Sequence, residues 1–95
     1  MIPSEKYVLR LYVTGMTPRS TRALKTVRAT CEEHLAGHYD LEVIDVYQTP
    51  GRIMEDQVVA IPTLVKQSPG PVRFIVGDMS DRTRLLQGLG LPLDD

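Results

Sequence analysis

The sequence predicts a single α/β domain that opens with a strand–helix–strand unit. An apolar run at 7–13 leads through a short elbow into a segment with helical periodicity, and a second apolar, β-rich run follows at 41–47. Two strands joined by a helix form a right-handed unit whose strands are parallel. A short helix, two more strands and a last helix are expected after it, which completes an α/β fold. The 95 residues are enough for one domain with a modest core.

The first strand and helix carry the clearest signals. The run at 7–13 is apolar without strict alternation, which is typical of an interior strand buried on both faces. Thr17 can cap the following helix, and Pro18 suits the first helical position because no N–H bond is lost there. The helix should end near Ala36, with Gly37 in the left-handed position that follows.

The middle of the chain predicts a short helix and a third strand. Thr49 is the expected cap of a helix that runs from Pro50 to about Gln57. The segment 58–65 is apolar and β-rich, but a proline cannot donate to a sheet ladder. We therefore expect a connection up to Pro62 and a strand after it. The bond before Pro62 can be cis.

The last quarter predicts a hairpin and a weak helix. The reversal at 68–71 should join two antiparallel strands, the second at 72–76. Ser80 is the expected cap of a final helix whose apolar face comprises Leu85, Leu86 and Leu89. Gly88 and Gly90 weaken that helix, each by about 1 kcal/mol relative to alanine if helical.

Few residues suit catalysis or metal binding, and we expect no catalytic, cofactor or metal site. Cys31 is the only cysteine; it lies on the apolar stripe of the first helix and should be packed and unreactive. His34 and His38 straddle Gly37, which makes a shared helix face doubtful. The helix N-terminus at 15–18 has N–H groups that can receive an anion, although a cap without a ligand is favoured.

The charge distribution is uneven although the net charge is only −1. Residues 1–36 carry six basic and three acidic side chains, and residues 37–95 carry five basic and nine acidic. Four basic residues recur every three positions on the first helix, at Arg19, Arg22, Lys25 and Arg28. They form either a solvated face or a patch for an acidic partner. Nothing indicates nucleic-acid binding, a signal peptide or a membrane span, so a cytoplasmic protein is expected.

The order of elements resembles the thioredoxin fold. Pro62 sits where thioredoxins place a cis-proline beside the active site, and the elbow at 16–20 sits where they carry two cysteines. This elbow has no cysteine, and disulfide exchange needs a thiolate. The remaining enzymatic alternative is a thioredoxin-fold enzyme such as a glutathione-dependent transferase that uses Ser20 or Thr17.

A long ordered string of residues, spanning roughly 6–91, resembles the KaiB circadian-clock family. The matching segments lie at 7–13, 17–18, 22–26, 43–46, 62–64, 71–73, 77–78 and 80–82. The resemblance covers nearly the whole chain and implies a single KaiB-like domain over 1–95. This sequence departs from the cyanobacterial pattern of the family at Glu42, Gln57 and Phe74, where basic side chains are common, and at Gly90, which replaces an aspartate.

The resemblance implies a binding protein rather than an enzyme. Such a protein docks on a KaiC-type ATPase ring and modulates its phosphorylation or output, in a circadian, timer or stress system. KaiA and a SasA-type histidine kinase are the further implied partners, and a SasA-type sensor or adaptor domain is the remaining alternative. The implied partner-binding residues are Tyr7, Arg22, Lys25, Gln57 and Arg73.

The resemblance also implies two arrangements of one chain. One is the thioredoxin-like fold read from the pattern above. The other is an oligomeric ground state, a dimer or tetramer, with the same strand–helix–strand unit and a rearranged C-terminal half. The implied fold-switch residues are Pro62, Pro69, Pro71 and Gly88.

Overall fold

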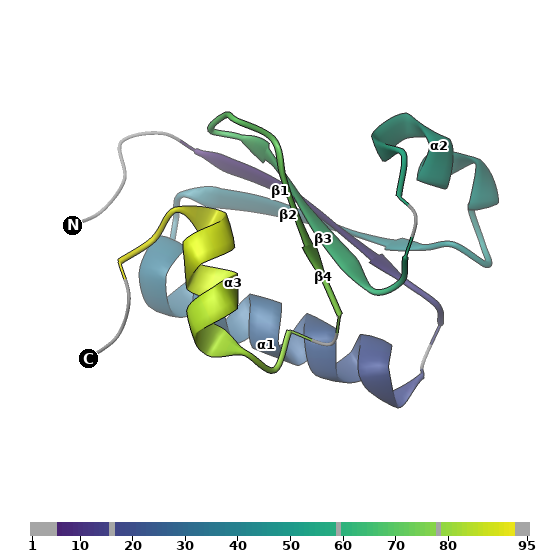
Figure 1. Ribbon diagram of the computed structural model, residues 1–95, viewed down its shortest axis with the longest axis horizontal. Helices are drawn as coiled ribbons and strands as arrows, with labels where there is room; N and C mark the ends of the chain where they lie inside the picture. Colours follow the sequence, from purple (N-terminus) through teal and green to yellow (C-terminus); the bar gives the residue numbers. More distant parts are fainter. Residues whose placement is uncertain (1–5, 16, 59, 78, 93–95) are drawn as a thin grey trace.

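The computed structural model describes residues 6–15, 17–58, 60–77 and 79–92 and contains a four-stranded mixed sheet with helices on both faces (Figure 1). The elements in chain order are β1 (Tyr7–Val13), α1 (Pro18–Leu35), β2 (Tyr39–Asp45), the 3-10 helix η1 (Pro50–Arg52), α2 (Ile53–Asp56), β3 (Thr63–Ser68), β4 (Arg73–Val76) and α3 (Arg82–Leu89). No helix in the described ranges is both long and apolar enough to cross a bilayer.

The strands lie in the order β2-β1-β3-β4, so β1 is an interior strand as predicted. β1 and β2 are parallel, with Tyr7 opposite Tyr39 and Val13 opposite Asp45. β1 and β3 are antiparallel, and β3 and β4 form the predicted antiparallel hairpin. The strand–helix–strand unit and the hairpin are therefore confirmed.

Four local predictions are wrong. β2 begins and ends two residues earlier than 41–47, because its pairing with β1 starts at Tyr39 and the Asp45 carboxylate accepts a bond from the Tyr47 N–H that turns the chain. The Thr49 side chain caps no helix; its hydroxyl donates to the Asp45 carbonyl at 3.2 Å.

The other two corrections concern α3. Asp81, not Ser80, is the N-cap, and its carboxylate accepts from the Arg84 N–H at 3.1 Å. Gly90 lies at the C-cap with φ +73°, a left-handed conformation that glycine adopts at little cost. Gly90 therefore ends the helix rather than weakening its interior, and only Gly88 lies within it.

The larger core lies between the sheet and the helices α1 and α3, which cover the same face (Figure 1). Its fully buried members include Leu11 from β1, Val27 from α1, Leu64 from β3 and Leu86 from α3. We call the opposite side of the sheet the open face. It carries a smaller cluster of Tyr12, Ile44, Val46, Val58 and Val65, over which η1 and α2 pack.

Candidate functional site: the elbow, the open face and the edge of the sheet

The hydroxyl groups of the elbow hold the helix in place. The Thr17 side chain accepts from the Ser20 N–H at 3.3 Å, which confirms the predicted cap. The Ser20 hydroxyl is buried and accepts from the Thr14 N–H at 3.0 Å. The side chains proposed for a transferase are thus engaged in local hydrogen bonds at the start of α1. Met16 lies outside the described residues.

Cys31 is fully buried on the inner face of α1. Burial raises the pKa of its thiol to about 12, because a thiolate would lose its hydration there. The nucleophilic form is therefore essentially absent near neutral pH. Burial confirms the prediction of a packed thiol.

One buried carboxylate fastens α2 to the open face. Asp56 is 8% exposed, and both its oxygens accept from Arg10 Nη1 at 3.0 Å. The Tyr12 hydroxyl donates to the same carboxylate at 2.5 Å, and the Gln67 amide donates to it as well. Burial and the neighbouring Asp56 raise the pKa of Tyr12 to about 12, so the phenol remains a donor over the physiological range.

A second, more exposed ion cluster borders this carboxylate. Arg52 in η1 donates to both Glu42 oxygens at 2.9 Å and to Glu55 at 2.9 Å. Arg10 lies 3.9 Å from Glu42 and connects the two clusters. Arg52 lowers the pKa of Glu42, chiefly through their hydrogen bonds. Glu42 thus has an intramolecular role as an anchor for η1.

This network was not predicted from the sequence. Its members lie far apart in the sequence: Arg10 and Asp56 are separated by 46 positions. The available signal was Arg10 itself, since a charged residue within an interior strand requires a partner. Nothing in the periodicity identified which acidic residue would provide it.

The residues implied as partner-binding lie on several elements of the fold. Arg22 and Lys25 are exposed on α1, Gln57 is exposed after α2, and Arg73 is exposed on β4. Tyr7 is only 5% exposed, and the Lys66 ammonium lies 6.0 Å from its ring centroid.

A shallow hollow of about 300 Å³ opens on the open face next to β4. Its lining comprises Gln57, Thr63, Phe74 and Val76. Gln57 has a left-handed backbone with φ +55°, and Phe74 and Val76 are large apolar side chains that are 49% and 40% exposed. Gln57 was predicted as a partner-binding residue, but the exposure of Phe74 and Val76 was not, because a β-rich run does not indicate which of its faces is covered.

The residues implied in fold switching lie in the C-terminal half. The bonds preceding Pro62, Pro69 and Pro71 are all cis. Gly88 lets α3 approach β4 closely: a Cβ at this position would lie 2.5 Å from Ile75 Cγ1, well inside contact distance.

Together, the fold and the elbow define a thioredoxin-like domain that lacks the thioredoxin cysteines. Solved structures of the same fold class are similar to this chain. The N-terminal domain of SasA from Synechococcus elongatus is 25% identical with a TM-score of 0.72, and the alignment covers 100% of this chain and 93% of that domain. Thioredoxin Deadhead from Drosophila melanogaster is 15% identical with a TM-score of 0.72, covering 92% of this chain and 81% of that one.

The chain belongs to the KaiB family. The KaiB domain model matches residues 10–91. A relative from Prochlorococcus marinus strain MIT 9303 is 52% identical over 95 residues, which is 100% of this chain and 80% of the relative. One from Nostoc punctiforme is 53% identical over 92 residues, 96% of this chain and 88% of the relative. Both are named circadian clock oscillator protein KaiB.

Proposed function

We propose that this chain is a non-enzymatic regulatory protein of a circadian, timer or stress system that docks on a KaiC-type ATPase ring and modulates its phosphorylation or output. The observation that carries the proposal is family membership across residues 10–91, with relatives about half identical that are named as clock oscillator proteins. The buried Cys31 and the hydrogen-bonded Ser20 support a role in binding rather than in chemistry.

The proposed partner contacts are Arg22, Lys25, Gln57, Arg73 and Tyr7. The first four have exposed side chains, three of them cationic, and suit an acidic partner surface. Tyr7 is buried against Lys66, so it contacts a partner only in an arrangement that uncovers its ring.

We also propose that the chain has a second arrangement, an oligomeric ground state in which the C-terminal half is rearranged. Pro62, Pro69, Pro71 and Gly88 all lie in that half and are its proposed switch residues. NMR secondary-structure shifts over residues 50–90 distinguish the two, because the rearranged state would place helix and strand at other positions.

The proposed docking is tested by mixing the chain with a KaiC-type ATPase and following a complex by size exclusion over hours. We expect a slowly formed complex that Lys25→Glu weakens. Lys6→Glu is the charge control, since it makes the same charge change at another exposed lysine, which directly precedes β1 and lies 3.8 Å from the Asp40 carboxylate. Absence of a complex in every phosphorylation state of the ring would contradict the proposal.

A second candidate is a sensor or adaptor module like that of SasA-type kinases. The structural similarity to the SasA N-terminal domain favours it. Under this alternative the chain binds a histidine kinase or KaiA in the absence of the ring. The transferase alternative is tested separately by titration with glutathione, which should give neither heat nor chemical-shift changes.

A further inference from the structure

β4 is an edge strand with hydrogen-bonding groups directed outward. It pairs with β3 on one side, and among the described residues no strand lies on its other side. The Gly77 N–H donates to the Pro62 carbonyl at 2.9 Å, so Gly77 faces β3. Because backbone groups alternate along a strand, the N–H and C=O groups of Phe74 and Val76 point away from β3. This edge can accept another extended segment.

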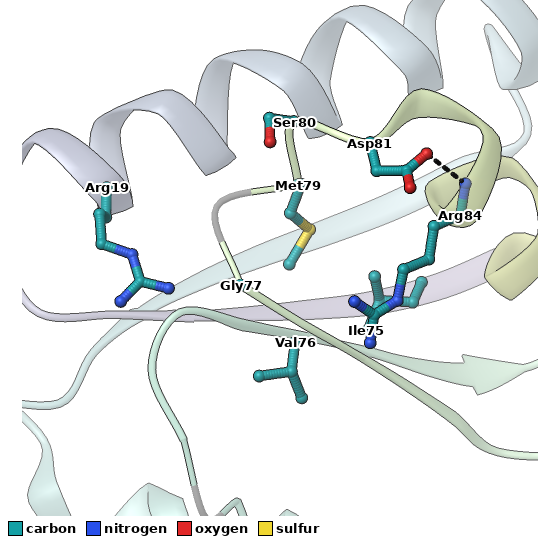
Figure 2. Close-up of a pocket in the computed structure, with 8 residues that line it drawn as sticks. All are labelled: Arg19, Ile75, Val76, Gly77, Met79, Ser80, Asp81 and Arg84. Carbon is teal, nitrogen blue, oxygen red and sulfur yellow. Dashed lines mark hydrogen bonds between the residues drawn. The ribbon is translucent and has the colours of Figure 1, made fainter.

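Three guanidinium groups lie along the helix side of this edge. Arg19 from α1 and Arg84 from α3 line a hollow of about 200 Å³ beside Val76, and Figure 2 shows them on either side of Met79. Arg73 lines a neighbouring hollow together with Arg84. None of the three forms an ion pair with a side chain that the structure describes. Asp81 is the one described acidic residue lining either hollow, and its carboxylate caps α3.

The other side of the same edge is apolar. Phe74 and Val76 project to the open face, opposite Val65 and Thr63 of β3. No described acidic or basic residue lines the hollow that they form. A strand added to β4 would therefore meet arginine side chains on one face and apolar side chains on the other.

We propose that β4 binds an extended segment of a partner protein in which acidic and apolar residues alternate. Successive side chains of a strand point to opposite faces, so the acidic ones would reach Arg73, Arg84 and Arg19 while the apolar ones pack on Phe74 and Val76. The backbone of the partner segment would form hydrogen bonds with the outward N–H and C=O groups of Phe74 and Val76. The proposal rests on the proposed function, since it describes how this chain holds a protein partner.

A second copy of this chain fits the edge poorly. Pairing β4 with itself, with both helix layers on one side, would bring the arginine side chains of the two copies together, which is unfavourable. The charge pattern thus favours an acidic segment over self-association.

The test uses the ¹⁵N-labelled full chain and a blocked hexapeptide of alternating glutamate and valine. We expect saturable NMR shifts centred on the amides of Phe74 and Val76. A control peptide with lysine in place of glutamate should bind about tenfold more weakly. Arg84→Gln should weaken binding of the glutamate peptide about threefold. Arg28→Gln makes an equal charge change on α1 and should leave binding unchanged.

Phe74→Pro provides a second test, because it removes an outward donor and no donor to β3. It should abolish peptide binding, whereas Phe74→Ala keeps the N–H and should only weaken it. Equal binding of both peptides, shifts centred on β2, or a β4 dimer that excludes the peptide would each overturn the proposal.

The same variants separate this proposal from the proposed function. If the glutamate peptide does not bind and Phe74→Pro still forms the complex with the KaiC-type ring, the edge proposal fails and the proposed function stands. If the peptide binds at β4 but no ring complex forms, the proposed function fails and the edge proposal stands.

Discussion

The two faces of the sheet are held by different forces. On the helix-covered face, α1 and α3 bury an apolar core together with side chains of β1, β3 and β4. On the open face, the four-residue helix α2 covers a smaller apolar cluster. The buried Asp56 carboxylate holds α2 there by accepting hydrogen bonds from Arg10 and Tyr12 of β1. Apolar burial scales with area, whereas a buried charge network depends on every member being paired. The open face should therefore loosen without unfolding the rest.

The largest expected effect lies on the helix-covered face. Leu11→Ala removes a fully buried side chain of β1 and should lower the free energy of unfolding by about 3 kcal/mol. Urea denaturation measures the change. Val43→Ala, at a partly exposed position of β2, is the control and should cost much less. Equal losses would show that the apolar core is not the main source of stability.

The next effect is on the open face. Asp56→Asn keeps the side-chain shape but removes the charge that Arg10 faces, so the free energy of unfolding should fall by about 2 kcal/mol. Glu55→Gln neutralises the adjacent, exposed carboxylate and serves as the matched control. If the two substitutions cost the same, the buried carboxylate does not fasten α2.

A smaller effect tests how α3 packs on β4. Gly88→Ala adds a methyl group against Ile75, which should cost about 1–2 kcal/mol and offset the gain in helix propensity of about 1 kcal/mol. In an Ile75→Ala background the obstruction is gone and the same substitution should stabilise the protein. A double-mutant cycle by urea denaturation measures this coupling; a coupling near zero would mean that α3 does not approach β4 closely in solution.

The smallest effect concerns the exposed Arg52–Glu42 pair. Since Arg52 lowers the pKa of Glu42 below its usual 4.5, the pair stabilises the folded state above that pH and loses its contribution as pH falls through the lowered value. Glu42→Gln should thus lower the free energy of unfolding slightly at pH 7 and not at all at about pH 2. In 1 M salt the loss at pH 7 should disappear as well. Urea titrations at both pH values check this. A cost that persists in acid would point to another role for Glu42.

Sequence signals correctly predicted the parts of the fold that depend on interactions between residues close together in the chain. The cap at Thr17 and the proline at Pro18 placed α1 correctly, because both act within one turn. The start of β2 depends on pairing with β1, and the fastening of α2 depends on Arg10 and Asp56, which are distant in sequence. Neither is visible in periodicity. The same reason hid the exposed Phe74 and Val76, whose surroundings are set by which helix covers which face.

Native-state hydrogen exchange by NMR tests the central contrast most directly. The amides of α2 should exchange through openings of much lower free energy than those of β1 and α1, and Asp56→Asn should accelerate α2 selectively. Exchange of α2 at the same opening free energy as β1 and α1, with Asp56→Asn changing all three alike, would contradict the claim that the two faces are held independently.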